Sequence, residues 1–378
     1  MPLPRTRGKA LRQRLAELRG PDVPAKALDA RALAALAANP GCRRRAILDG
    51  AGVDKTALAS ALGSPSAFGQ SQFALTRGNA FEAKVKADGG AELLRLVHEK
   101  LDRRAEPPAD AAVPDLSAIG PEGRTARTAL ALREATEAPG TWTLLDHPML
   151  ALDVAGSPAF LEPDAVVVHP DGSWTVVEIK SFPMLDGSAD PAKVGAAARQ
   201  AAVYVLALEE VAARLDPAPE VRHRVLLVCP KDFSNLPTAS AVDVRKQRAV
   251  TGRQLARLTR IEDIADALPD GTCFSPDLPT PELTAAVESV PATYAPECLS
   301  ACELAFHCRA RSRESGAVTT LGRSIRAELG GLTTTEDVLS AARGETGDPE
   351  DPAVAALRRA AGLRAEALAA AMAGGAVR

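Results

Sequence analysis

Hydrophobic positions in the middle of the chain follow the period of β-strands. The segments 141–154, 162–169 and 173–182 are alternating or β-branched, and the tetrapeptide HPDG joins the last two as a turn. Helical periodicity at 191–213 and an apolar run at 222–230 come next. The order helix, three strands, helix, strand predicts an α/β core with a mixed sheet.

Helical patterns flank this core on its N-terminal side. The segments 1–20 and 25–39 precede a further helix that begins at Cys42. Two glycines at 89–90 are expected to interrupt a helix that resumes after them. Residues 106–123 are rich in Pro and Gly, which predicts a surface loop before a helix near 124–137.

The C-terminal part of the chain is also mainly helical. Residues 244–268 have a helical pattern, 275–296 are rich in proline, and the Ala-rich end is predicted to be a helical appendage. The predicted organisation has three parts, listed here in order: an N-terminal helical region at 1–75, a core with a C-terminal cysteine cluster at 76–312, and the appendage at 313–378.

Composition and charge limit the classes of protein to which the chain can belong. The 378 residues are 46% hydrophobic, enough for a large core in two or three domains. A net charge of −3 gives no global attraction to nucleic acid, so such a surface must be a local patch. No apolar run approaches the ~20 residues that span a bilayer, and the basic N-terminus lacks a signal-like apolar stretch. We therefore expect a cytoplasmic protein without a membrane partner, whose six cysteines are thiols or metal ligands.

Three polar residues interrupt the apolar strands around the HPDG turn. Strand alternation puts Glu178 and Lys180 on one face, and the turn folds the preceding strand back so that Asp164 approaches Glu178. Converging carboxylates repel unless a cation or a proton lies between them, and oxygen ligands suit Mg²⁺ or Mn²⁺. The alternative is an edge hairpin with a solvated polar face.

These residues have the order of a known nuclease signature. Pro163–Asp164, followed after thirteen residues by Glu178–Ile179–Lys180, resembles the PD-(D/E)xK motif. Gln200 and Tyr204, spaced i, i+4 on a helix, resemble the QxxxY motif of the RecB-type branch. The stretch RGNAFEAKV resembles the first motif of that branch, in which a glycine begins a helix and a metal-site residue follows; Glu82 stands where many members have histidine.

The resemblance implies a restriction-endonuclease-like core that hydrolyses DNA with the help of Mg²⁺ or Mn²⁺. By this reading Glu82, Asp164, Glu178 and the Ile179 carbonyl bind the ion, Lys180 orients and activates water, and Gln200 and Tyr204 hold the site and the DNA backbone. Single- or double-stranded DNA ends would be the substrate of an exonuclease, with proteins of a repair or defence complex as partners. The alternative is a non-catalytic DNA-binding or scaffold subunit.

A second cluster is formed by cysteines in CLSACELAFHC. Cys298, Cys302 and Cys308 need a fourth ligand to complete a zinc site or a [4Fe–4S] cluster, and Cys42, Cys229, Cys273 and His307 are candidates. AddB-like subunits and CRISPR-associated RecB-like exonucleases carry a cluster on one cysteine before the nuclease core and three after it. That resemblance implies Cys42 as the fourth ligand and [4Fe–4S] in preference to Zn²⁺, although three residues separate Cys298 from Cys302 where two are usual.

A basic segment follows the predicted core. It contains no acidic residue between 245 and 260, and it is either a phosphate-binding surface with little sequence specificity or a solvated helix face. Its candidate DNA contacts are Arg245, Lys246, Arg248, Arg253, Arg257 and Arg260. The histidines at 98, 147, 169 and 223 are interpreted as structural.

Overall fold

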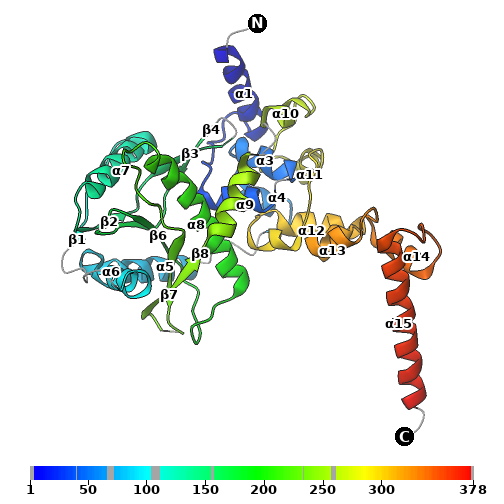
Figure 1. The fold of residues 1–378 in the computed structure, drawn as a ribbon. Coiled ribbons are helices and arrows are strands. Elements are labelled where there is room, and N and C mark those ends of the chain that lie inside the picture. The colour runs from blue at the N-terminus through cyan, green and yellow to red at the C-terminus, as the bar shows by residue number, and fades with distance from the viewer. Residues whose placement is uncertain are drawn as a thin grey trace.

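The core of the protein is an open, mixed β-sheet flanked by helices (Figure 1). The computed structural model describes residues 4–39, 41–65, 72–103, 111–154, 157–232, 234–256 and 261–375. Within these ranges the fold is α/β, with helical regions on the N-terminal and C-terminal sides of the sheet, as the hydrophobic pattern predicts.

Six strands form the main sheet in the order β1-β2-β5-β6-β7-β8. The β1–β2 and β6–β7 pairs are parallel, and the β2–β5, β5–β6 and β7–β8 pairs are antiparallel. The strands are β1 (Ala111–Ala112), β2 (Trp142–Asp146), β5 (Ala165–Val168), β6 (Trp174–Ile179), β7 (Arg224–Pro230) and β8 (Pro237–Asp243). A separate two-stranded sheet pairs β3 (Leu150–Val154) with β4 (Ser157–Leu161).

The β5–β6 hairpin forms where the sequence predicts it. Gly172 adopts a φ of +80°, which favours glycine, and its N–H donates to the His169 carbonyl at 2.8 Å to close the turn. Every residue of both strands is buried. Burial on both faces explains why the two strands read as nearly continuous apolar runs.

Helices cover both faces of the sheet. The crossover helix α8 (Pro191–Ala212) connects the parallel strands β6 and β7, and its first turn is capped by Asp190. It lies with α7 (Gly120–Thr136) on one face, whereas α5 (Gln72–Val85) and α6 (Ala87–Leu101) lie on the other (Figure 1).

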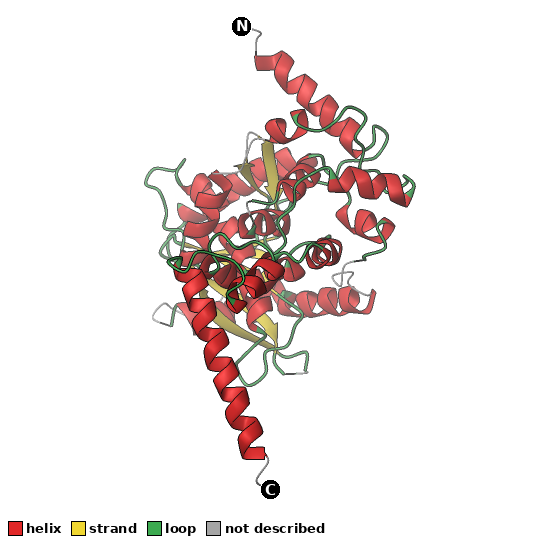
Figure 2. Ribbon diagram, turned by 90° about the vertical axis from the view of Figure 1, so that its right-hand side faces the viewer, coloured by secondary structure: helices red, strands yellow, loops and turns green. Residues whose placement is uncertain are grey.

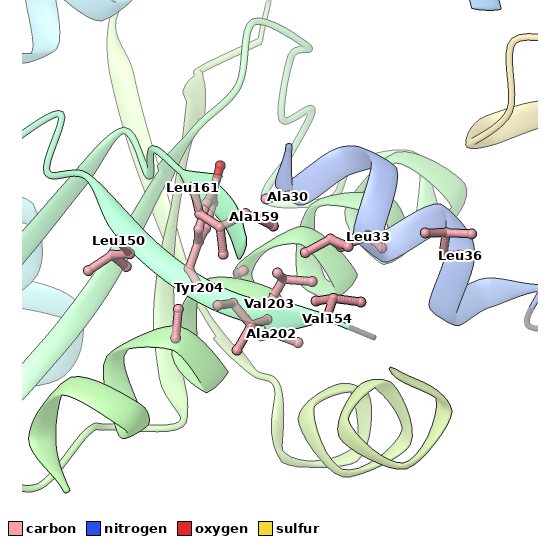
Figure 3. Packing of buried hydrophobic residues seen from close by; sticks show 14 of the residues in the cluster. Ala30, Leu33, Leu36, Leu150, Val154, Ala159, Leu161, Ala202, Val203 and Tyr204 are labelled. Atoms are coloured by element: carbon pink, nitrogen blue, oxygen red, sulfur yellow. The ribbon is translucent and has the colours of Figure 1, made fainter. Parts of the chain in front are cut away.

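Two further helices pack on the outer side of α8, namely α2 (Ala30–Ala38) and α9 (Arg245–Ala256). Figure 3 shows Leu33 of α2 and Val203 of α8 in the same apolar cluster as Leu161 of β4. The two-stranded sheet therefore packs in the same apolar cluster as the crossover helix and α2.

The remaining helices flank this core, and α15 projects away from the rest of the chain (Figures 1 and 2). They are α1 (Pro4–Arg19), α3 (Arg43–Gly50), α4 (Lys55–Ala61), α10 (Ile261–Asp266), α11 (Thr280–Glu288), η1 (Pro296–Ser300), α12 (Ala305–Glu314), η2 (Val318–Leu321), α13 (Arg323–Glu328), α14 (Thr335–Arg343) and α15 (Pro352–Gly375).

The structure differs from the sequence prediction in the strand region. The segment 141–154 forms two strands that belong to different sheets, because the chain bends at His147, where φ is +46°. Strands β4 and β8 were not predicted. Both contain Pro and small residues, which weaken the usual β-strand signal.

Other differences concern helix boundaries. The proline-rich passage contains α11, whose Pro281 lies in the first turn, where proline is tolerated. The predicted loop at 106–123 includes β1 and the start of α7, and its residues 106–110 lie outside the described ranges. The predicted interruption at the two glycines is confirmed, because Asp88, Gly89 and Gly90 all have positive φ.

Candidate metal centre

Three polar side chains meet at the end of strand β6. The β5–β6 register pairs Ala165 with Val177, which places Asp164, just before β5, opposite Glu178. Asp164 Oδ2 accepts a hydrogen bond of 2.6 Å from the backbone N–H of Ile179. The predicted approach of Asp164 to Glu178 is therefore observed. We call Asp164, Glu178 and Lys180 the carboxylate site.

Glu178 is the most deeply buried acid of this site. Its neighbours Val177 and Ile179 belong to the core on the α5–α6 side, so alternation points Glu178 toward α8. The residue is 1% exposed, and neither of its carboxylate oxygens has a hydrogen bond. Burial raises its pKa to about 7, and the charge of Asp164 adds to this effect. A buried carboxylate with unused acceptor capacity is suited to bind a cation.

Lys180 forms an ion pair with Glu178 at the partly open side of the site. Burial alone would lower the pKa of Lys180, but the charges of Glu178 and Asp164 outweigh it and raise that pKa. The amine therefore stays protonated. An ammonium group in this position can hold a water or a phosphate oxygen, but it cannot accept a proton.

Gln200 and Tyr204 lie next to each other on α8. Gln200 Nε2 donates to the Tyr204 hydroxyl at 3.0 Å, and that hydroxyl donates to the Glu162 carbonyl at 3.1 Å. Tyr204 is 4% exposed, and burial together with the charge of Glu178 raises its pKa. The pair thus fixes the segment that leads into Asp164.

Glu82 lies near the end of α5 and is already engaged by neighbouring cations. Its Oε1 lies 2.6 Å from Lys86 Nζ and 3.0 Å from His147 Nε2. Hydrogen bonding with His147 lowers the pKa of Glu82 to about 2, and Lys86 contributes to the shift. Gly78 lies inside α5, not at its start as expected, and a Cβ there would meet Ser181 only at an ordinary 3.8 Å.

The structure therefore brings together Asp164, Glu178 and Lys180. Glu82 is instead paired with Lys86 and His147. Within the described ranges, no group of three or more His, Cys, Asp or Glu side chains is arranged to hold a metal ion. The contact of His147 with Glu82 was not predicted from the sequence, where His147 was interpreted as structural. Only the fold reveals that the β2–β3 bend carries it to Glu82.

The cysteines from both ends of the core lie in one region, which we call the cysteine site. Cys42 precedes the first residue of α3, Cys298 lies in η1, and Cys308 lies in α12. Cys42, Cys298 and Cys302 line a common cavity of about 20 Å³. The thiols predicted to act together are thus neighbours, although they are not arranged around a common centre.

Polar side chains from the N-terminal helices donate to these thiols. Arg44 Nη1 donates to Cys308 Sγ at 3.3 Å, and Asn39 Nδ2 donates to Cys298 Sγ at 3.5 Å. Burial raises the pKa of Cys308 to about 12, an effect that Arg44 opposes and Cys302 increases.

A buried arginine closes the cysteine site. The Arg45 side chain is 4% exposed and forms ion pairs with Asp49 at 2.5 Å and Glu303 at 2.7 Å. Because Glu303 follows Cys302 directly, this pair ties α3 to the C-terminal cysteine segment.

The other candidate ligands are less suited to complete the cysteine site. Cys229 lies on β7 in a separate apolar cluster with Met184 and Ala197. His307 is buried on α12 with its Nε2 lacking a hydrogen bond, 3.8 Å from Glu288. All six cysteines are free thiols.

The basic helix α9 is partly neutralised by acidic partners. Arg245 pairs with Asp243, and Arg248 pairs with Glu209 of α8, with Nε–Oε2 at 2.9 Å. Lys246 and Arg253 are exposed. Two other predicted DNA contacts, Arg257 and Arg260, lie outside the described residues.

Helices α8 and α9 run antiparallel. Arg248 contacts Glu209, whereas Gly252, further along α9, packs near Leu206, earlier on α8. The C-terminal half of α9, with Arg253, therefore points toward the part of α8 that carries Tyr204. Arg253 is exposed on this half of α9.

No protein-family model, curated protein or solved structure matches the chain significantly. Among the helices of the described ranges, none is both long and apolar enough to cross a membrane.

Proposed function

We propose that the chain is a divalent-metal-dependent DNA nuclease of the RecB-type PD-(D/E)xK class. The observation that carries this proposal is Glu178, a fully buried carboxylate without a hydrogen bond, placed between Lys180 and Asp164. Burying a carboxylate is costly even beside one ammonium group, so a protein retains such an arrangement mainly for function.

The donor chemistry fits Mg²⁺ or Mn²⁺. Asp164 and Glu178 offer hard carboxylate oxygens, and the Ile179 carbonyl follows directly in the chain. A bound divalent ion lowers the pKa of water and neutralises charge on a phosphate. Glu82 can join these ligands once its contact with Lys86 is released.

The protein groups around the ion have separate roles. The Lys180 ammonium orients a water or a phosphate oxygen, because it stays protonated. Tyr204 and Gln200 keep the segment before Asp164 in place through the Glu162 carbonyl. The exposed Arg253 on α9 gives the DNA backbone a point of attachment beyond the site.

We further propose that Cys42, Cys298, Cys302 and Cys308 hold a [4Fe–4S] cluster. Three of these thiols line one cavity, and the fourth, Cys308, is close enough to Cys302 and Cys42 to be affected by their charge. Thiols are the soft ligands that iron–sulfur clusters and zinc take. Arg44 and Cys308, already in contact, are 264 positions apart in the chain. A cluster there would act as a structural cross-link over a long loop, which requires no electron transfer.

The decisive experiment is cleavage of end-labelled single- and double-stranded DNA by the purified protein with Mg²⁺, Mn²⁺ or a chelator. We expect cleavage with either ion, none with the chelator, and none by the Asp164→Ala or Glu178→Ala variants. DNA binding without cleavage by the wild-type protein would instead support a non-catalytic scaffold subunit.

A further inference from the structure

Lys86 is the centre of a polar cluster beside the carboxylate site. Its Nζ lies 2.6 Å from Glu82 Oε1, 2.6 Å from Asp146 Oδ1 and 3.0 Å from His147 Nε2. The Lys86 side chain is 11% exposed, so its ammonium is largely shielded from water. One cation thus contacts two carboxylates and an imidazole, which are ligand types that Mn²⁺ also accepts.

The bend that carries Asp146 and His147 is fixed to the carboxylate site. The His147 N–H donates to the Asp164 carbonyl at 3.3 Å. Arg124 donates both to the His147 carbonyl at 2.8 Å and to Glu162 Oε1 at 2.6 Å. His147 has a φ of +46°, which is uncommon for a residue other than glycine and persists where the surroundings enforce it.

Glu82 and Glu178 differ in how their charge is balanced. The pKa of Glu82 is lowered to about 2, first by its hydrogen bonding with His147, so Glu82 stays ionised and already has cationic partners. Glu178, in contrast, is paired with Lys180, but burial still raises its pKa to about 7. The charge of Glu82 still contributes to raising the pKa values of Asp164 and Glu178, so the three carboxylates act on one another.

We propose that Lys86 is an internal cation that holds Glu82 in place of a divalent ion and thereby weakens ion binding at the carboxylate site. This inference rests on the proposed function, because it assigns Glu82 to the same ion. Two physical effects contribute. The ammonium must release Glu82 before this carboxylate can bind an ion, and its positive charge repels that ion at short range.

Calorimetric titration with Mn²⁺ alone tests the proposal on the full chain. Lys86→Met should bind Mn²⁺ at least about tenfold more tightly than the wild type, since both the competition and the repulsion are removed. Lys86→Gln, which keeps polarity without charge, provides a second variant of the same kind. Lys86→Arg can still bridge the two carboxylates and should bind within about twofold of wild type.

Two controls identify the cause of the change. Lys84→Met removes an exposed charge at the end of α5, two residues before Lys86, without touching the cluster, so its Mn²⁺ affinity should equal that of the wild type. Relative to Glu82→Gln alone, the double variant Glu82→Gln, Lys86→Met should show a smaller gain, because only the repulsion remains to be removed when Glu82 can no longer bind the ion as a carboxylate.

The outcomes separate this inference from the proposed function. Unchanged or weaker Mn²⁺ binding in both Lys86→Met and Lys86→Gln overturns the role of Lys86, since a purely structural lysine would weaken the site when removed. Tighter Mn²⁺ binding without DNA cleavage by any variant supports the role of Lys86 and refutes the nuclease. Cleavage by the wild type with unchanged affinities refutes only the role of Lys86.

Discussion

The carboxylate site and the cysteine site are built in opposite ways. Asp164, Glu178 and Lys180 lie on one hairpin and the residue that follows it, and a hydrogen bond from Ile179 fixes their relative positions. The cysteine site joins segments from both sides of the core, held by the contacts of Arg44 and Arg45 with residues near the C-terminal cysteines. The first site depends on local register, and the second depends on the completed fold.

Because of this difference, we expect substitutions at the two sites to affect different properties of the protein. Removing a side chain from the carboxylate site leaves the hairpin, its buried strands and its turn in place. Removing a thiol from the cysteine site removes a link between distant parts of the chain. We therefore expect changes at the first site to alter rates and changes at the second to alter folding.

The largest expected effect is on catalysis. Lys180→Ala should reduce DNA cleavage by about 10²–10³-fold, the usual contribution of one donor that stabilises charge in the transition state. Thermal unfolding should change little, because Lys180 is partly exposed, and Mn²⁺ binding should not weaken, because Lys180 is not a metal ligand and its ammonium only competes with the ion for Glu178. Lys193→Ala, an exposed lysine at the start of α8, is the matched control. Cleavage by Lys180→Ala at the wild-type rate would exclude this site as the nuclease centre.

The next effect is on stability. Cys302→Ala should abolish iron and acid-labile sulfide binding in protein purified without oxygen, and it should lower the free energy of unfolding by about 2–5 kcal/mol, the range for loss of a native cross-link. Cys273→Ser, at a cysteine outside the site, should keep both properties. One equivalent of zinc without iron in the wild type would assign the site to zinc.

A smaller effect concerns the other end of the hairpin. His169 is buried, with Nδ1 3.0 Å from Asp102 Oδ2 and Nε2 2.8 Å from Thr175 Oγ1. Burial lowers its pKa to about 4, and Arg222 adds to this shift, whereas the unfolded value is about 6.5. The unfolded chain therefore binds more protons between these values, so this group's contribution to stability is complete above pH 6.5 and is lost as the pH falls toward 4.

Chemical denaturation at several pH values measures this effect. The difference in unfolding free energy between wild type and His169→Asn should shrink from pH 7 to pH 4.5. Taking this difference cancels the titration of all groups that the two proteins share. A difference that stays constant with pH would show that His169 does not titrate in this range. The amount of iron bound at the cysteine site should not affect the result.

The smallest effect is on DNA binding. Arg253→Ala should weaken DNA binding several-fold without changing the thermal stability. The slope of log affinity against log salt concentration should fall by about one, as expected for the loss of one phosphate contact. Arg248→Ala is the informative partner, because Arg248 is paired with Glu209 and should affect stability more than binding. Equal DNA binding by wild type and Arg253→Ala at several salt concentrations would show that the basic face of α9 is solvated and does not contact phosphate.

The hairpin could be predicted because its determinants are local. Alternation, the HPDG turn and the spacing of Asp164 from Glu178 together define the register, and the structure follows them. The crossover helix was also predicted nearly to the residue, since its periodicity is long and regular. These elements contain most of the proposed catalytic groups.

The contacts of Glu82 could not be predicted because they depend on tertiary structure. Nothing in the spacing along the chain indicates that the Lys86 ammonium contacts Glu82, Asp146 and His147 together. The bend at His147 requires a conformation that the sequence rarely announces, and it separates two strands that read as one. Strand β8 was missed for a related reason, because its small residues become a strand through pairing with β7.

The contact between Arg44 and Cys308 also has a consequence for synthesis of the protein. A ribosome makes Arg44 early and Cys308 only after most of the chain, at a rate of about 5–20 residues per second. The β5–β6 hairpin can therefore pair while the chain is still growing, whereas the cysteine site can form only after residue 308 has been added. Any chain that ends before this residue lacks the complete site, and its N-terminal helices lack the contact between Arg44 and Cys308.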